Sequence, residues 1–286
     1  MPFAWTQENL STINITKEPY AARASFDLHC NAMFSEYCAE ADQKKIYLIN
    51  LLKRKGNELR LSEQLEDILK ITKEDYANDK KQIGYSNLDF HHLCKDNQDA
   101  IDDLLDSVAD EYLNEFGIYH EIRHPISKEG RVLSKQSGVV RTNCLDCLDR
   151  TNVTKMKVCL KAFNDFVWHK GANDKVIGLG SSDSEQKREI ERTIVCMWAV
   201  AGDLISKVYC GTESTLTAVT LKGHEDFTDH VGRYMTSARR FVNQKFTDEF
   251  KQECILILQG LHPSSVTKSM IYAKSKINHI SKSVDF

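Results

Sequence analysis

The stretch RTNCLDCLDRTNVTK, residues 141–155, holds two cysteines, two aspartates and two arginines within its first ten positions. A Gly-Val-Val run precedes it and leads out of a polar loop, as a short buried strand does. Apolar residues then recur at steps of three and four, at Val153, Met156, Leu160, Phe163 and Val167. The stretch therefore predicts a strand, a tight loop and the start of a helix, a unit typical of α/β proteins.

A strand, a loop and a helix N-terminus in succession create a place where anions bind. Backbone N–H groups converge there, and the helix dipole adds positive potential. Cys144 and Arg150 are separated by five residues, a spacing that lets the loop close around an anion while the guanidinium arrives from the far side. Phosphate suits this cradle, because its oxygens accept the bidentate arginine fork.

Cys144 is the candidate nucleophile of this loop. The positive field is expected to lower the pKa of its thiol from about 8.5, so that thiolate is abundant at neutral pH. Attack on phosphorus would give a thiophosphate intermediate and split hydrolysis into two easier displacements. Thr151, directly after the arginine, can donate its hydroxyl to the Cys144 sulfur and ease the departure of that sulfur from phosphorus.

A leaving alkoxide also needs a proton, and three carboxylates are candidates for the general acid. Asp146 and Asp149 lie within the loop, and Asp89 lies in the earlier stretch LDFHHLCK. For Asp149 we favour a structural role, in which it accepts hydrogen bonds from loop amides or orients Arg150. For Asp146 the acid role and the structural role stay open. Cys147 is expected to pack beneath the loop.

Two other interpretations use the Cys144-x-x-Cys147 pair. It could be a redox pair, or it could be half of a zinc site. The remaining zinc ligands would be His91, His92 or Cys94. Zinc is disfavoured because the sequence has no second C-x-x-C and because a metal site gives the arginine and threonine of the loop no role.

Bulk properties exclude several classes of protein. The 286 residues suffice for a sizeable core, and 41% hydrophobic with 28% charged residues is ordinary for a soluble protein. Nine cysteines, an odd number spread irregularly, predict reduced thiols. A net charge of -3 argues against a nucleic-acid partner. No run reaches the roughly 18 apolar residues of a membrane span, and no signal-peptide pattern opens the chain. We expect a soluble, non-secreted protein without a transmembrane segment.

Other segments predict one α/β domain with a mixed central sheet flanked by helices. Strands are expected at residues 45–53, up to Leu88 and at 118–122, and helices at 98–116, 190–208 and 234–258. A Gly-Ser-rich patch at residues 171–184 predicts a flexible loop. Residues 1–262 form the expected catalytic domain, and 263–286 form a basic tail.

Residues 141–152 closely resemble the R-x-N-C-x-D-C-L-D-R-T-N signature of the Sac-domain phosphoinositide phosphatases, a long and specific motif. Further stretches similar to motifs of that family are PFAWTQ, FDLH, YLINLLKRKGNE, LDFHHLCK, WAVAGDLISKVYCGT and GRYMTSARRFVNQKFTDEFKQ. The resemblance runs from about residue 2 to residue 261. Two features depart from it: the chain begins at the first motif, without the strand-rich subdomain that usually precedes it, and residues 215–230 are less basic than in the family. The chain is expected to be a minimal catalytic version or a part of a longer protein.

The resemblance implies roles for residues of this chain. Cys144 would be the nucleophile and Arg150 the phosphate-binding arginine of a cysteine-phosphatase-like strand–loop–helix unit. The residues that would shape the loop or assist catalysis are Asp146, Asp149, Thr151, Asn152 and Asp89. The substrate would be lined by Asn143, Leu145, Cys147, Leu148, Asn152, His91 and Lys155. The implied reaction uses no metal and no other cofactor.

The favoured function is hydrolysis of a phosphate monoester on the inositol ring of a phosphoinositide, the 4-phosphate ahead of the 3-phosphate. The protein would act peripherally on the cytosol-facing leaflet. Alternatives are a phosphatase of soluble inositol phosphates or phosphoproteins, a catalytically weak phosphoinositide-binding module, and a zinc-bound interaction domain. Solvated faces are expected for the basic residues Lys155, Lys157, Lys161, Arg239 and Arg240, unless they flank the pocket mouth and meet other phosphates.

Overall fold

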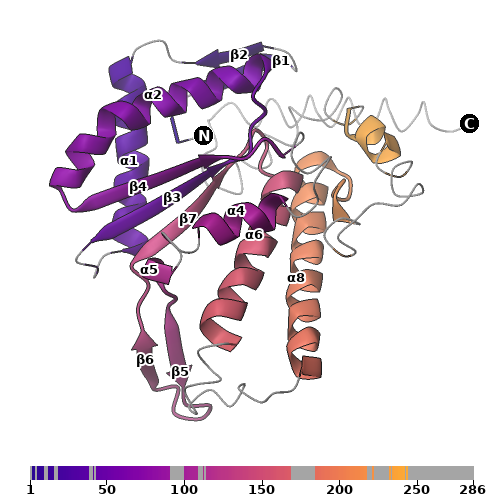
Figure 1. Ribbon diagram of the computed structural model, residues 1–286. Coiled ribbons are helices and arrows are strands. Elements are labelled where there is room, and N and C mark those ends of the chain that lie inside the picture. The colour runs from indigo at the N-terminus through magenta and orange to yellow at the C-terminus, as the bar shows by residue number, and fades with distance from the viewer. Residues whose placement is uncertain are drawn as a thin grey trace, which may run out of the picture.

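The computed structural model describes residues 2–3, 5–9, 12–15, 19–38, 41, 43–90, 100–108, 112, 114–168, 184–217, 221, 232, 234–241 and 243. His91, His92 and Cys94, which the disfavoured zinc interpretation would add to the cysteine pair, lie outside the described residues, as do residues 171–183 of the Gly-Ser-rich patch and the basic tail. In the described part, a small parallel sheet is flanked by helices on both faces (Figure 1). The α/β class predicted from the sequence is confirmed.

The central sheet consists of β4 (Lys81–Asn87), β3 (Lys44–Asn50) and β7 (Gly138–Asn143), in that order. Both pairings are parallel. Parallel neighbours need a crossover connection, and α2 (Gly56–Asn78) supplies it between β3 and β4. The middle strand, β3, ends in five consecutive buried residues, as expected for a parallel strand covered on both faces.

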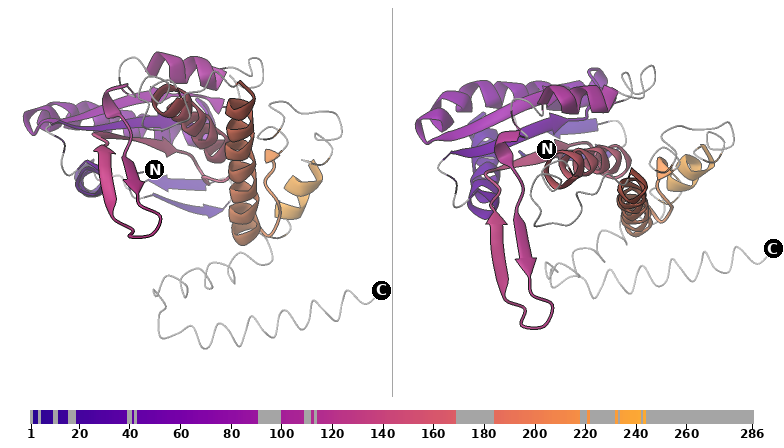
Figure 2. Two further views of the ribbon diagram at one scale, coloured as in Figure 1. Left: turned by 90° about the horizontal axis from the view of Figure 1, so that it is seen from below. Right: turned by 60° about the horizontal axis from the view of Figure 1, so that its bottom comes forward.

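The prediction of a mixed central sheet was wrong. Antiparallel pairing among the described strands occurs only in two separate ribbons, β1 (Trp5–Asn9) with β2 (Thr12–Ile15) and β5 (His120–Arg123) with β6 (Gly130–Ser134). The β5–β6 ribbon stands away from the body of the domain (Figure 2), and every residue of β6 is exposed. A strand that buries no side chain gains nothing by joining the sheet, and its backbone groups pair within the ribbon instead.

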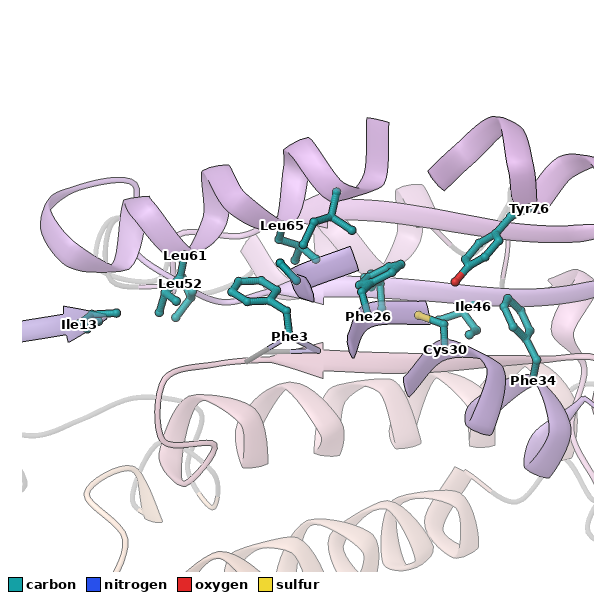
Figure 3. Packing of buried hydrophobic residues seen from close by; sticks show 13 residues of the cluster. Phe3, Ile13, Phe26, Cys30, Phe34, Ile46, Leu52, Leu61, Leu65 and Tyr76 are labelled. Carbon is teal, nitrogen blue, oxygen red and sulfur yellow. The ribbon is translucent and has the colours of Figure 1, made fainter. Parts of the chain in front are cut away.

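One face of the sheet is covered by α1 (Pro19–Tyr37) and α2. Figure 3 shows Phe26 and Phe34 of α1 in the same cluster as Ile46 of β3 and Leu65 of α2. All four side chains are almost completely removed from water. Burial of such side chains stabilises the fold by roughly 1.5–3 kcal/mol each. The two helices are therefore held on this face by the apolar positions they share with β3.

The other face carries α4 (Ala100–Val108) and α6 (Asp149–Ala162). Leu105 of α4 and Val153 of α6 belong to a second core with Ile49 of β3. The sequence predicted one helix across 98–116, and its described parts include α4 and the short α5 (Asn114–Phe116); residues 109–111 and 113 lie outside the described residues. At its other end α6 continues as a π-helical turn, η2 (Phe163–Trp168).

The last long helix, α8 (Ser184–Cys210), packs along α6 and confirms the helix expected at 190–208. The helices approach closely at Gly202, where a Cβ atom would meet the side chain of Asn152. The Asn152 amide donates to the Trp198 carbonyl (2.9 Å) and joins the two helices. By length and composition alone α8 could also cross a membrane, although no unbroken apolar run marks it in the sequence. Of its most apolar window, 22% is buried within the domain.

Candidate active site

The loop that carries Cys144 leaves the carboxyl end of β7, and α6 begins where the loop ends. Backbone hydrogen bonds gather the three strand ends at this edge. Leu51 N donates to Asn143 O (2.8 Å), and Leu88 N donates to Asn50 O (2.8 Å). The strand, loop and helix predicted from residues 141–155 are confirmed. The carboxyl edge of a parallel sheet is also where α/β domains place their ligand sites.

Cys144 lies in the core that α4 and α6 share, and 0% of it is exposed. Burial raises the pKa of its thiol, and the positive charge of Arg150 opposes that rise without overcoming it. The expected lowering of this pKa is thus not found, because desolvation exceeds the attraction of the guanidinium. The Cys144 Sγ atom lies 4.0 Å from Asp146 Oδ1, at the outer limit of an S–H···O contact.

Arg150 is held at the end of β3. Its Nη1 atom donates to the Leu51 carbonyl (3.1 Å) and to Glu58 Oε2 (3.0 Å). Both side chains of this ion pair are mostly buried, with 11% of Arg150 and 14% of Glu58 exposed. Glu58 Oε2 also accepts from Lys53 N (2.9 Å). The arginine of the loop is therefore anchored to the turn between β3 and α2.

Asp149, the first residue of α6, is surrounded by donors. Arg240 makes two hydrogen bonds to it (2.6 and 3.1 Å), and Ser214 Oγ, Thr215 N and Thr215 Oγ1 make three more. Burial alone would raise the pKa of this carboxyl, but the hydrogen bonds and the charge of Arg240 hold the pKa below its usual value. Asp149 is thus an ionised structural acceptor and a poor proton donor, but its partners are Arg240, Ser214 and Thr215, and not the loop amides or Arg150 expected from the sequence.

Arg240 was expected on a solvated face, and this expectation was wrong. Only 12% of its side chain is exposed. Besides Asp149 it binds Ser206 Oγ (2.7 Å), Thr212 Oγ1 (3.1 Å) and the Glu213 carbonyl (3.1 Å). Arg240 therefore ties the end of α8 and the segment after it to the beginning of α6.

Asp146 is the exposed carboxylate of the loop. Its Oδ1 atom accepts from Leu148 N (3.2 Å) while facing the Cys144 thiol. Cys147 is exposed as well, with a φ of +58°, so it does not pack beneath the loop as expected. The left-handed backbone at Cys147 turns its side chain outward, and its Sγ contacts the Cys144 carbonyl (3.8 Å).

Two buried polar groups of the strand–loop–helix unit around Cys144 lack a partner in the described part of the chain. They are the hydroxyl of Thr151 and the side-chain amide nitrogen of Asn143. The bond predicted from Thr151 to the Cys144 sulfur is not formed in this arrangement. A buried donor without a partner is costly, so both groups are suited to a ligand or an ordered water.

The remaining loop residues take part in packing. Leu148 is buried, Leu145 packs against the core between α1 and α2, and Asn152 joins α6 to α8. Lys155, the seventh residue of α6, is exposed. Ion pairs within the domain engage Lys157 with Asp102 and Lys161 with Asp106 and Asp165. The contacts described for these side chains are all with other residues of the chain.

The neighbouring motif is described only up to Phe90. Asp89 Oδ2 accepts from Arg54 N (2.9 Å), which places this carboxylate beside the turn after β3. His91 lies outside the described residues, as do His92 and Cys94. Among the residues that the structure describes, no group of three or more histidines, cysteines and acids is arranged to hold a metal ion.

A cleft of about 620 Å³ lies at the carboxyl end of α8. Its lining residues are Lys207, Gly211, Thr212, Glu213, Thr236, Ala238, Arg239 and Asn243. None of them belongs to the loop, so the size of this cleft does not identify the reacting site. The polar and charged side chains of the candidate site, Arg150 and Asp146, lie instead around Cys144.

Comparison with known proteins adds to this geometry. The family model of the SacI homology domain matches residues 1–95. The inositol-1,4,5-trisphosphate 5-phosphatase 1 of Schizosaccharomyces pombe is 30% identical over 266 residues, which are 91% of this chain and 22% of that protein. The polyphosphatidylinositol phosphatase INP53 of Saccharomyces cerevisiae is 28% identical over 268 residues, 92% of this chain and 22% of the relative. Matches of this extent include the Cys144 loop.

A third relative, the phosphatidylinositol-3-phosphatase SAC1 of Saccharomyces cerevisiae, is 28% identical over 223 residues, 77% of this chain and 34% of that protein. The fold and site define an α/β protein with a small parallel sheet whose carboxyl edge carries a cysteine and an arginine. Over most of its length the chain is similar to proteins of the Sac-domain family. It spans between about a fifth and a third of the length of the three relatives described.

Proposed function

We propose that this chain is a cysteine-dependent phosphatase that removes a phosphate monoester from the inositol ring of a phosphoinositide. The observation that carries the proposal is the position of Cys144 and Arg150 at the two ends of the loop between β7 and α6. Support comes from relatives named as phosphoinositide phosphatases, whose aligned regions include this loop. The C-x5-R loop would be the phosphate cradle.

Several donors are suited to the phosphate oxygens. The N-terminus of α6, a helix of 14 residues, adds positive potential behind the loop. The unpartnered Asn143 amide directly precedes Cys144, and the unpartnered Thr151 hydroxyl directly follows Arg150 in the first turn of α6. Arg150 makes its described hydrogen bonds through Nη1 alone, which leaves Nε and Nη2 for a bidentate contact. These fixed donors would stabilise the charge that develops on the equatorial oxygens.

Asp146 is suited to carry the proton of both displacements. In the first step the Cys144 thiol gives its proton to Asp146, the thiolate attacks phosphorus, and the bond from phosphorus to the inositol oxygen breaks. The same proton then passes from Asp146 to the leaving alkoxide. In the second step water attacks phosphorus while Asp146 takes a proton from that water, the S–P bond breaks, and Asp146 returns the proton to the leaving sulfur as phosphate is released. The 4.0 Å contact and the exposure of Asp146 support this assignment.

Because the pKa of the Cys144 thiol is raised, a neighbouring base is needed to remove its proton before the sulfur can attack phosphorus. Cys144 is mostly un-ionised while the loop is empty and buried, because desolvation outweighs Arg150. Proton transfer to Asp146 would be favoured when loop donors and a bound phosphate bring the thiol and the carboxylate closer than 4.0 Å. Catalytic contacts of this kind often tighten only in the complex with substrate.

The finer features of the proposal follow the resemblance to the Sac-domain family. Residues 1–262 would form the phosphatase domain and residues 263–286 a basic tail. The substrate would lie in the cytosol-facing leaflet, with the 4-phosphate hydrolysed ahead of the 3-phosphate and with Lys155 near its headgroup. No metal ion would take part.

Phosphate release from a panel of substrates tests this function. Phosphoinositides in vesicles, their short-chain soluble forms and soluble inositol phosphates are compared at equal concentration, with reductant and a chelator present. We expect release from phosphatidylinositol monophosphates in both lipid forms, at rates the chelator does not change. Lipid binding without release from the folded protein would favour the binding module instead, and release from soluble inositol phosphates alone would favour a different substrate class.

A further inference from the structure

We propose that Glu58 is the positioning residue of Arg150 and that it decides which edge of the guanidinium faces the phosphate. The inference rests on the proposed phosphatase function and deepens it. Glu58 touches neither Cys144 nor the loop backbone in the described contacts, and it would act only through the arginine. It is separated from Arg150 by 92 residues along the chain.

Glu58 is itself held firmly. It lies in the first turn of α2, directly after a turn that passes through Gly56 with a φ of +62°. One of its oxygens, Oε2, accepts both from Lys53 N (2.9 Å) and from Arg150 Nη1 (3.0 Å). A carboxylate near the N-terminus of a helix is also favoured by the helix dipole. The acceptor that meets Arg150 is therefore fixed by the backbone on both sides of the turn.

The contacts of the guanidinium leave one edge available. Both described acceptors, Glu58 Oε2 and the Leu51 carbonyl, bind Nη1. A guanidinium has five N–H groups in one plane, and two of them belong to Nη1. The N–H groups of Nε and Nη2 donate to no residue that the structure describes. Nε and Nη2 form one edge of the plane, and that edge matches the two oxygens of a phosphate.

The same turn also fixes the other end of the loop. Leu51 accepts from Arg150 through its carbonyl, and its own N–H donates to the carbonyl of Asn143, the residue before Cys144 (2.8 Å). One backbone segment therefore sets the position of the arginine and of the nucleophile together. Glu58 completes this arrangement, because the carbonyl alone would let the guanidinium rotate about a single hydrogen bond.

A different role for Glu58 is simple neutralisation of the buried guanidinium. That role depends on charge and not on contact, so alanine and glutamine at position 58 would have the same effect. It also predicts tighter binding of oxyanions when the negative charge is removed. Positioning predicts the reverse: glutamine keeps an acceptor oxygen and part of the function, and alanine keeps neither.

The test uses Glu58→Ala, Glu58→Gln and the matched control Glu63→Ala, an exposed glutamate on the same helix. We expect Glu58→Ala to lower kcat roughly 100-fold and Glu58→Gln roughly tenfold, with KM little changed, as misplacement of a catalytic group does. The control should keep the wild-type kcat. Equal losses in the alanine and glutamine variants, or an equal loss in the control, would overturn the proposal.

A double-mutant cycle separates action through Arg150 from any other effect of Glu58. On an Arg150→Lys background, Glu58→Ala should cost no further activity. The second readout is the rise in Tm on adding orthovanadate, which reports oxyanion binding without turnover. We expect Glu58→Ala to reduce that rise in the wild-type background and to leave it unchanged with Arg150→Lys.

The two readouts distinguish the inference from the proposed function. Coupling in the vanadate cycle without phosphate release from any substrate would keep the inference and reject the phosphatase. Phosphate release with no coupling between Glu58 and Arg150 would reject the inference alone. A wild-type protein whose Tm does not respond to orthovanadate would overturn the inference, since Arg150 would then hold no oxyanion.

Discussion

Replacement of Cys144 by serine is expected to abolish phosphate release, with kcat lower by roughly 10⁴–10⁶-fold, as when a catalytic nucleophile is removed. Serine differs from cysteine at this position by one atom, and its hydroxyl can still face Asp146. Its oxygen is a far weaker nucleophile than a thiolate at neutral pH, because it stays protonated. The measurement is phosphate release at saturating substrate.

The fold should survive this replacement, and a second cysteine provides the control. Cys196 on α8 is exposed and lies outside the loop, so Cys196→Ser should keep the wild-type kcat. Both variants should unfold at nearly the same urea concentration as the wild type. Residual release by Cys144→Ser above about 1% of the wild-type rate would contradict nucleophilic attack by this sulfur, given the loss expected when a nucleophile is removed.

The second large effect is expected from Arg240→Ala, which should lower the free energy of unfolding by about 3–5 kcal/mol. The change leaves Asp149 mostly buried without its cation and removes the contacts to Ser206 and Thr212. Breaking one partner of a buried pair costs more than the pair contributes, since the remaining charge stays desolvated. Urea unfolding at pH 7 measures the loss.

The pH dependence of this loss follows from the lowered pKa of Asp149. A carboxyl whose folded pKa lies below its unfolded pKa stabilises the fold above the unfolded value, and this contribution disappears as the pH falls through the folded value. The difference between wild type and Arg240→Ala should therefore narrow below about pH 4, near the ordinary aspartate pKa. A difference that stays constant down to pH 3 would contradict the role of the ionised carboxylate.

The neighbouring arginine supplies a matched control for Arg240. Arg239 lies on the same helical segment, and its side chain is exposed. Arg239→Ala should change the free energy of unfolding by less than about 0.5 kcal/mol, as surface substitutions usually do. An equal loss in both variants would mean that helical propensity, and not the contact with Asp149, sets the effect.

Local patterns in the sequence were enough to predict the strand, loop and helix around Cys144. The strand β3 and the helix α8 were also predictable, because an apolar run and a 3.6-residue period are local signals. Helix α1 was overlooked, although Ala22, Phe26, Cys30 and Phe34 repeat every four residues and all are buried. This spacing could have identified it.

The contacts of Glu58 and Arg240 with the loop could not be predicted from the sequence, because they join residues far apart along the chain. Glu58 and Arg240 meet the loop from positions about ninety residues away, and no local spacing relates them to Arg150 or Asp149. Their only signal was membership in the family-like stretches YLINLLKRKGNE and GRYMTSARRFVNQKFTDEFKQ. The raised pKa of Cys144 likewise depends on core packing, which decides desolvation and is invisible in a motif.

The central claim is that the Cys144 sulfur takes the phosphoryl group, and trapping that intermediate tests it most directly. Wild-type protein is mixed with a phosphatidylinositol monophosphate carrying a radiolabelled ring phosphate, quenched during the first turnover and digested for peptide mapping. Label is expected on the peptide that contains Cys144, is lost on later hydrolysis and is never formed by Cys144→Ser. Label on a different residue, or full phosphate release by a protein that never carries label at Cys144, would contradict it.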